Sequence, residues 1–456
     1  MEDRSNKQNK MGTMSMGKLL ITMSGPAIVS MMINALYNIV DSIFVAQIGE
    51  DAFTAVSIVF PVQMLIICVA VGTGIGINSL ISRRLGAGKK DEAELAASNG
   101  IKLAVLNWVI FSIVGIFFSG PFVKIFSHDA NIVSYGTTYL TIVAAGCLFL
   151  NTSMIIEKIF QATGNMIVPM ITVSISAITN IILDPILIFG LLGFPKLGIA
   201  GAAIATVFAQ CLGMCIGLYI LITKNHAINF TLKGKINLDI IKEIYKVGLP
   251  SIVMQALVSI MIFGMNAILI TFSSTAVAVM GIYGKVQSFV FMPCFGVNQG
   301  ALPIMGYNYG AGDRKRMFHC YKLGIIMSVS IMFAGLLVFQ FAPHVLLKMF
   351  NASPEMMGIG VTALKRISWC FIPAGFGIIT AGLFQATGHG MLSMWGAIIR
   401  QFVGTLPFAF IFGKIFGLDM VWFAFAAAEI VGMIYYLIVL KYINEKTFKK
   451  MECRNE

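Results

Sequence analysis

An aspartate inside a segment apolar enough to cross a lipid bilayer is costly to bury, so such a residue is by default a candidate for function. Asp41 lies in a segment of this kind, near 17–46. Asn34, Tyr37, Asn38 and Asp41 follow the spacing i, i+3, i+4, i+7, which predicts one polar face on an otherwise apolar helix. A polar face that ends in a carboxylate could bind a cation or hold a proton.

A second aspartate, Asp184, lies one helical turn after Asn180 in another apolar segment. Pro185 follows it and leaves a backbone carbonyl free one turn earlier. Counted from the cytoplasmic ends of their helices at about 1.5 Å per residue, Asp41 and Asp184 both reach the outer half of the membrane. Two carboxylates at one depth suit Na⁺ ligation or proton exchange. The alternative is that a neighbouring hydroxyl or amide satisfies each carboxylate separately.

The elements that would hold these residues are transmembrane helices. Of the 456 residues, 58% are hydrophobic and 11% are charged, whereas a soluble domain has about 25% charged residues. A soluble enzyme, a DNA-binding protein and a secreted disulfide scaffold are therefore excluded. Apolar segments of about 20 residues or more predict twelve spanning helices. They lie near 17–46, 52–82, 95–120, 132–156, 165–190, 197–222, 238–271, 276–306, 318–343, 355–382, 390–413 and 420–443.

The chain has 32 basic and 20 acidic residues, a formal net charge of +12, and the basic residues are placed unevenly along it. They gather near the N-terminus, in the loops around 83–90 and 314–322, in the segment 223–246 and in the C-terminal tail. Short loops rich in Lys and Arg stay in the cytoplasm. Their alternation with nearly uncharged loops predicts cytoplasmic termini and a cytoplasmic middle segment. It also disfavours a nucleic-acid patch as the explanation of these clusters.

The chain contains an internal repeat. An offset of 224 residues aligns Phe160–Gly164 with the identical Phe384–Gly388, and Gly86–Gly88 with Gly310–Gly312. Each half holds six predicted helices, an even number, so both halves enter the membrane from the same side. Transporters are often built from such parallel repeats, with the substrate site between the halves.

We therefore predict an all-α integral membrane protein with twelve helices in two parallel six-helix repeats. The predicted parts are a cytoplasmic tail (1–16), an N-lobe (17–222), a cytoplasmic linker (223–237), a C-lobe (238–443) and a cytoplasmic C-terminal tail (444–456).

The same offset pairs Pro26 with Pro250, each early in the first helix of its lobe. Proline removes a backbone donor and loosens the helix around it, so both are candidates for bending during gating, with a static kink as the alternative. Three basic residues within C-lobe helices, Lys285, Arg366 and Arg400, could line a cavity of that lobe. Alternatively, they reach the membrane surface or form structural ion pairs.

These features resemble the MATE (multidrug and toxic compound extrusion) family of transporters. The resemblance covers about residues 15–445 and rests on the two six-helix halves, the paired glycine motifs, and the segments Asn180–Pro185 and Leu197–Thr206. It implies a secondary active antiporter, not an enzyme, which exports amphipathic, often cationic compounds by alternating access of two lobes. It further implies a monomer in the bacterial cytoplasmic membrane, with no nucleic-acid or obligate protein partner and no cofactor besides the coupling ion, H⁺ or Na⁺.

The resemblance also implies where the coupling ion binds. In the DinF-like branch the site maps onto Asp41, Asn180, Asp184 and Thr206, with Tyr37 beside it. The NorM-like branch has acidic residues in the seventh and tenth helices, where this chain has acids only at the helix edges. This departure favours the DinF-like or MepA-like branch and leaves both coupling ions open.

The alternative class is a flippase or exporter of lipid-linked saccharides or other lipid-like substrates, in which Lys285, Arg366 and Arg400 would bind phosphate groups. The chain has no Walker, HExxH or GxSxG motif, so ATP-driven transport and membrane proteolysis have no support.

Overall fold

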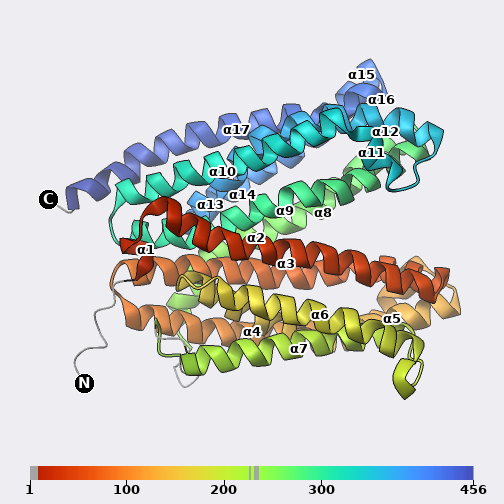
Figure 1. Ribbon diagram of the computed structural model, residues 1–456, viewed down its shortest axis with the longest axis horizontal. Helices are drawn as coiled ribbons and strands as arrows, with labels where there is room; N and C mark the ends of the chain where they lie inside the picture. The colour runs from red at the N-terminus through yellow and green to blue at the C-terminus, as the bar shows by residue number, and fades with distance from the viewer. Residues whose placement is uncertain (1–8, 225–226, 231–235, 455–456) are drawn as a thin grey trace. The chain divides into compact units, whose positions relative to one another are not determined.

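The structure is a computed structural model that describes residues 9–224, 227–230 and 236–454, and every regular element in these residues is a helix (Figure 1). Twelve helices are long and apolar enough to cross a membrane. This confirms the predicted all-α membrane fold with twelve spanning helices. The cytoplasmic position of the termini stays a prediction.

The first nine spanning helices are continuous and the last three are composite. The continuous helices are α2 (Met16–Ile48), α3 (Glu50–Gly86), α4 (Lys90–Phe126), α5 (Ala130–Ala162), α6 (Ile167–Phe189), α7 (Ile199–Lys224), α8 (Leu238–Leu269), α9 (Ser274–Gly310) and α10 (Arg314–Phe341). The tenth combines α12 (Pro354–Ile367), η2 (Ser368–Cys370) and α13 (Phe371–Ala386). The eleventh combines α14 (Gly390–Ile398), η3 (Ile399–Thr405) and α15 (Leu406–Phe416). The twelfth begins with α16 (Leu418–Val421) and continues through α17 (Ala424–Ile443), η4 (Asn444–Phe448) and η5 (Lys449–Arg454).

The shorter elements α1 (Lys10–Thr13), η1 (Leu191–Gly193) and α11 (Pro343–Lys348) lie outside these spans. Several spanning helices extend past their apolar segments. Helix α4 begins at Lys90 instead of near 95, and its first turn carries Asp91 and Glu92. Acidic side chains stabilise the N-terminus of a helix, which explains why the helix starts among charged residues.

The repeated glycine motifs are turns that follow helices in both halves. Gly88 and Gly312 have φ angles of +73° and +77°, and Gly164 and Gly388 have φ angles of +87° and +84°. A residue with a Cβ atom adopts such angles only at a cost in free energy. The backbone therefore follows the 224-residue repeat at these turns, and glycine is required at each of them.

Helix eleven is interrupted by the π-helix η3. The backbone nitrogen of Leu406 donates to the carbonyl of Gln401, five residues earlier, which widens the turn. Pro407 follows directly and has no N–H to donate to the preceding turn. The apolar pattern predicts a spanning helix near 390–413, and the structure confirms this span over Gly390–Phe416 with a π-helical turn inside it. Apolar periodicity carries no sign of one extra residue in a turn, so the π-helix was not predictable from that pattern.

The contacts divide the chain into two compact units. Among the described residues, unit 1 comprises the chain up to Ile28, Gly86–Gly88 and the chain from Val253, and unit 2 comprises Val29–Leu85 and Lys89–Ile252. The first part of α2 therefore belongs to unit 1, and the first part of α8 to unit 2. Pro26 and Pro250 lie inside these helices, two residues before the boundaries. The lobe ranges 17–222 and 238–443 follow chain order and stay a prediction.

Glycines let these shared segments pack closely inside each unit. In unit 2, a Cβ atom on Gly72 of α3 would lie 2.6 Å from the backbone nitrogen of Ile252 in α8. In unit 1, a Cβ atom on Gly296 of α9 would lie 2.8 Å from the backbone nitrogen of Ile28 in α2. With the 224-residue offset, Gly72 corresponds to Gly296, and Ile28 corresponds to Ile252. The repeat in the sequence is thus also a repeat of helix packing.

Candidate functional site

Unit 2 brings the two predicted aspartates together from different helices. Asp41 lies on α2 and Asp184 on α6, and their carboxyl groups are within hydrogen-bonding reach of each other. Asp184 is fully buried, and Asn180 and Thr206 are 1% and 4% exposed. The sequence indicates a common depth for the two aspartates, and the structure adds that they form one site.

Asn180 connects Asp184 with Thr206 of α7. Its amide nitrogen donates to Asp184 Oδ2 at 2.9 Å, and its amide oxygen accepts from the Thr206 backbone nitrogen at 3.1 Å and from Thr206 Oγ1 at 3.3 Å. The amide orientation is assigned from these partners. Asn180 and Asp184 lie one turn apart and so share a face of α6. Three of the four residues predicted to bind the coupling ion thus form one hydrogen-bonded set.

The polar face of α2 is divided. Tyr37 lies one turn before Asp41, and its hydroxyl is within hydrogen-bonding reach of Thr206. Asn38 is exposed and donates its amide to the backbone oxygen of Asn34 at 2.7 Å. Tyr37 and Asp41 therefore reach the site, whereas the Asn38 amide bonds to its own helix. A helical spacing shows that residues share a face, but it does not show how wide a part of that face meets a neighbouring helix.

Two residues near the site were not predicted. Tyr139 of α5 is 3% exposed, lies within electrostatic range of Asp41 and is within hydrogen-bonding reach of Gln63 of α3. A tyrosine in an apolar helix has no pattern that separates it from core residues. Gln63 did carry a signal, because the repeat offset matches it with Gln287, and a glutamine at membrane depth in both halves marks a polar position.

The donor atoms of this site are oxygens from two carboxyl groups, an amide and hydroxyls. Asp41 Oδ1 is buried and has no hydrogen-bond partner in the structure, so the site retains an unused acceptor that a cation or a proton could satisfy. In the part of the chain that the structure describes, no three or more His, Cys, Asp or Glu side chains form a group that could hold a metal ion. Oxygen donors with two acidic groups fit Na⁺ or a shared proton better than a zinc or iron site.

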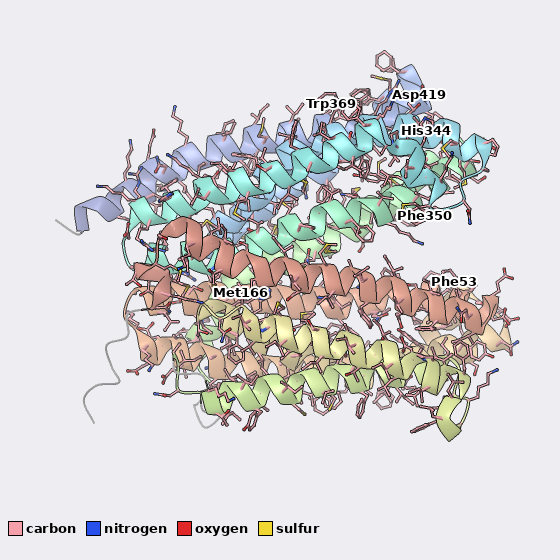
Figure 2. All side chains as sticks on the ribbon, in the orientation of Figure 1. Phe53, Met166, His344, Phe350, Trp369 and Asp419 are labelled. Carbon is pink, nitrogen blue, oxygen red and sulfur yellow. The ribbon has the colours of Figure 1, made fainter. Side chains whose placement is uncertain are left out.

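The three basic candidates of the C-terminal half lie in different surroundings. Lys285 of α9 is exposed. Arg366 of α12 pairs with Asp419 of α16 at 3.8 Å, at the end of unit 1 where Asp419 is labelled in Figure 2. Arg400 of η3 pairs with Glu429 of α17 at 2.9 Å. Two of the three therefore have a carboxylate partner on a neighbouring helix.

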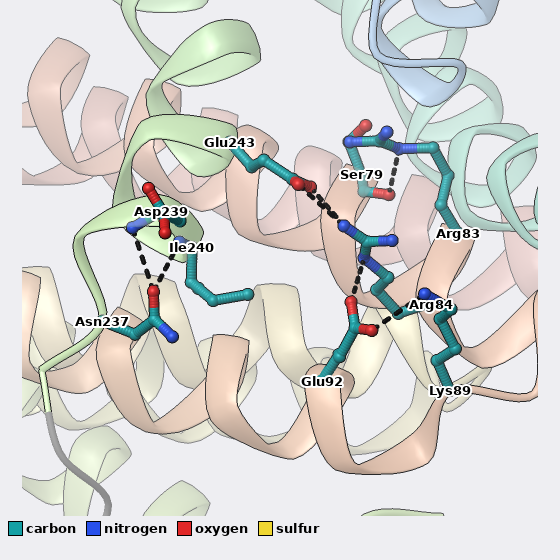
Figure 3. A network of polar contacts seen from close by, with 9 residues as sticks. All are labelled: Ser79, Arg83, Arg84, Lys89, Glu92, Asn237, Asp239, Ile240 and Glu243. Atoms are coloured by element: carbon teal, nitrogen blue, oxygen red, sulfur yellow. Dashed lines mark hydrogen bonds and ion pairs between the residues drawn. The ribbon is translucent and has the colours of Figure 1, made fainter.

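A second charged network lies at helix ends of unit 2 (Figure 3). Arg84 of α3 donates to both carboxylate oxygens of Glu243 in α8, at 2.8 and 2.7 Å, and pairs with Glu92 of α4 at 3.0 Å. Lys89 pairs with the same Glu92 at 2.9 Å. The side chains of Arg84 and Glu243 are 23% and 40% exposed, so the network ties helix ends together at a partly hydrated surface.

Twelve helices of membrane-spanning length, a repeated six-helix pattern and a buried oxygen-rich site define a multi-pass membrane transporter. The sequence model of the MatE family matches residues 26–186 and 250–411, which is more than half of the chain. The protein belongs to the MatE family, and the predicted MATE resemblance is confirmed.

Its relatives are transporters. The chain is 26% identical over 443 residues to the multidrug export protein MepA of Staphylococcus haemolyticus (strain JCSC1435), with 96% of each chain covered. It is 25% identical over 405 residues to the FAD transporter of Shewanella oneidensis, with 86% of this chain and 87% of that protein covered. A solved structure of a multidrug resistance MATE family transporter in an outward-facing conformation has a TM-score of 0.91 at 26% identity and covers 98% of this chain and 99% of that one. The protein is therefore a MATE-family membrane transporter of the MepA-like branch.

Proposed function

We propose that this protein is a secondary active efflux transporter of the cell membrane that exchanges amphipathic, cationic compounds for H⁺ or Na⁺. The observation that carries the proposal is the pair of neighbouring carboxyl groups formed by Asp184, which is fully buried, and Asp41, which is partly buried with its Oδ1 atom shielded from solvent. Two adjacent carboxylates in a low-dielectric site cannot both stay ionised without a positive partner. The site therefore takes up a cation or a proton, and its release can be coupled to transport.

Helix α2 connects this site to a conformational change. It contains both Asp41 and Pro26, and its first part, up to Ile28, belongs to unit 1 whereas Asp41 belongs to unit 2. A change of charge at Asp41 thus acts on a helix that the two units share. Pro26 weakens the helix near the boundary, and Pro250 does the same in α8. Bending at these prolines would support alternating access of the two lobes.

The relatives' names contain two substrate classes, drugs and FAD. The acidic groups of the site, with Tyr37 beside them, favour a cationic amphipathic substrate over an anionic dinucleotide, which remains the second candidate. The lipid-linked saccharide alternative needs free positive charge for phosphate groups. It is less well supported, because Arg366 and Arg400 are each paired with a carboxylate.

The proposal is tested by efflux of a fluorescent organic cation from proteoliposomes under a Na⁺ gradient and under a pH gradient, imposed separately. Asp41→Asn and Asp184→Asn keep shape and hydrogen-bonding capacity but remove charge, so each should abolish gradient-driven efflux with little loss of thermal stability. Asp51→Asn is a matched control, because Asp51 is an exposed carboxylate in the first turn of α3.

Near wild-type efflux by either aspartate variant would show that its carboxyl group is only structural. Gradient-driven efflux of FAD without efflux of the organic cation would select the second candidate instead.

A further inference from the structure

Unit 1 contains an ion pair between helices eleven and twelve. Arg400 Nη1 lies 2.9 Å from Glu429 Oε1, and the two side chains are 27% and 13% exposed. Removing charged groups from water costs several kcal/mol for each ion, and close pairing only offsets this cost. A pair of apolar side chains could fill the same space without this desolvation cost, so the presence of the ion pair calls for an explanation.

The two helices approach closely around the ion pair. A Cβ atom on Gly432 of α17 would lie 3.5 Å from the Cβ atom of Arg400, and a Cβ atom on Gly404 would lie 2.7 Å from that of Ala428. The π-helix η3 forms this contact, and Thr405 Oγ1 donates to the Arg400 backbone oxygen at 3.0 Å. The guanidinium group is therefore anchored on an irregular turn against α17, and π-helical turns are frequent at functional sites.

The sequence repeat relates this ion pair to the carboxylate site of unit 2. Helices eleven and twelve are the counterparts of α6 and α7, which carry Asn180 and Thr206. With the 224-residue offset, Glu429 falls one position before the counterpart of Thr206, and Arg400 falls one helical turn before the counterpart of Asn180. Each unit thus holds a carboxyl group on this pair of equivalent helices: Asp184, which is fully buried, in unit 2 and Glu429, whose side chain is 13% exposed, in unit 1. The difference is that unit 1 supplies its own positive charge.

Further oxygen atoms lie on the elements around Glu429. Tyr283 of α9 is 1% exposed and lies within electrostatic range of Glu429. Gln401, the neighbour of Arg400 on η3, is 3% exposed, and its Oε1 atom has no hydrogen-bond partner in the structure. The titratable groups within electrostatic range of Glu429 are thus Arg400, Tyr283, Cys370 of η2 and Tyr436 of α17. A tyrosine near a carboxylate matches Tyr37 beside Asp41 in unit 2.

We propose that Glu429 is the centre of a second, masked cation site, in which the guanidinium of Arg400 takes the place of an exchangeable cation. The proposal extends the proposed function, because it compares this site with the coupling site of unit 2. A guanidinium stays charged at all relevant pH values and cannot leave the chain. Unit 1 therefore keeps its cation throughout a transport cycle, whereas unit 2 exchanges its own. Without Arg400, Glu429 should accept Na⁺ or a proton.

The test uses a full-length background variant in which Asp41→Asn and Asp184→Asn remove the site of unit 2. Thermal stability of the purified protein in detergent is measured with Na⁺ or choline at fixed pH, and at two pH values without Na⁺. The background should show no stabilisation by either ion. Adding Arg400→Gln should restore a rise in melting temperature of several degrees, with Na⁺ or at the lower pH. The two arms identify the ion.

Two controls separate this result from a general effect of removing charge. Arg366→Gln on the same background removes a positive charge from the pair with Asp419, whose side chain is 64% exposed, and should restore no stabilisation. Adding Glu429→Gln to Arg400→Gln should abolish the restored stabilisation. If Arg400→Gln on the background with Asp41→Asn and Asp184→Asn, without Glu429→Gln, folds only when Na⁺ or acid is present, that dependence supports the masked site equally.

The proposal is overturned if Arg400→Gln folds on the background with Asp41→Asn and Asp184→Asn and its melting temperature rises neither with Na⁺ nor at the lower pH. It is also overturned if Arg400→Gln fails to fold under every ionic condition whereas Arg400→Gln with Glu429→Gln folds. Failure of the proposed function can be told apart from failure of the masked site. If Asp41 and Asp184 bind no ion, Na⁺ or a lower pH would stabilise the wild-type chain no more than it stabilises the background variant.

Discussion

Gly72 provides a quantitative test of how α8 packs in unit 2. A Cβ atom at this position would lie 2.6 Å from the backbone nitrogen of Ile252, and ordinary contact begins near 3.4 Å. Gly72→Ala therefore requires α3 and α8 to separate by about 0.8 Å, the difference between these two distances. Backbone atoms cannot rotate away as the end of a side chain can, so the helices must move or lose contacts.

Overpacking of this kind costs about 1–3 kcal/mol. Replacing glycine by alanine inside a helix otherwise contributes about 0.5–1 kcal/mol of stability. We therefore expect Gly72→Ala to have a net cost of up to about 2.5 kcal/mol. The expected result is a melting temperature several degrees below that of the wild type.

Gly120 of α4 is the matched control, because it lies inside a helix of the same unit and a Cβ atom there would come no closer than 3.8 Å to Thr137. Gly120→Ala should leave the melting temperature unchanged or raise it. Gly296→Ala, the counterpart of Gly72→Ala in unit 1, should be destabilising like Gly72→Ala. The assay is thermal unfolding of the purified protein in one detergent. Equal melting temperatures for Gly72→Ala and Gly120→Ala would refute the close approach of α3 and α8.

Three further predictions concern the site, the charged network and the orientation in the membrane. Thr206→Ala withdraws one neutral oxygen from the proposed coupling site, so gradient-driven efflux should fall but remain measurable, unlike in Asp184→Asn; complete loss would mean that the hydroxyl is indispensable. Arg84→Gln should cost about 1 kcal/mol or less, since its ion pairs are partly exposed; a large drop in melting temperature would show that the network is essential for folding. Lys90→Cys, on a background without native cysteines, should react with a membrane-impermeant thiol reagent only from the cytoplasmic side; labelling from outside would reverse the predicted topology.

The fold was predictable because its signals are strong and local. An apolar segment of sufficient length has one plausible environment, and the 224-residue offset between Phe160–Gly164 and Phe384–Gly388 establishes the duplication independently of any structure. Asp41 and Asp184 were found for the same reason, since a charge at membrane depth is rare and costly.

The remainder depends on which helices meet, and a single sequence does not contain that information. Tyr139 was missed because a tyrosine is common in apolar helices, and only the packing of α5 near Asp41 gives it a polar neighbour. The amide of Asn38 was expected on the functional face, yet it bonds to its own helix. Glu429 had no assigned role in the sequence, because its partner Arg400 lies on another helix and is held on a π-helical turn.

The division of the chain also departs from chain order for a physical reason. A helix that belonged wholly to one unit could transmit a change at its ion site only through side-chain contacts. Helix α2 instead continues covalently from unit 1 into unit 2, with Pro26 close to the boundary and Asp41 beyond it. Any change in the direction of this helix at Pro26 necessarily changes the direction in which the helix approaches Asp41. Helix α8 repeats the arrangement with Pro250 but has no acidic residue at the position that corresponds to Asp41, where the chain has Met265. The duplicated fold therefore supplies two shared helices, and only one of them carries an aspartate at this position, so the proposed ion binding would act on α2 alone.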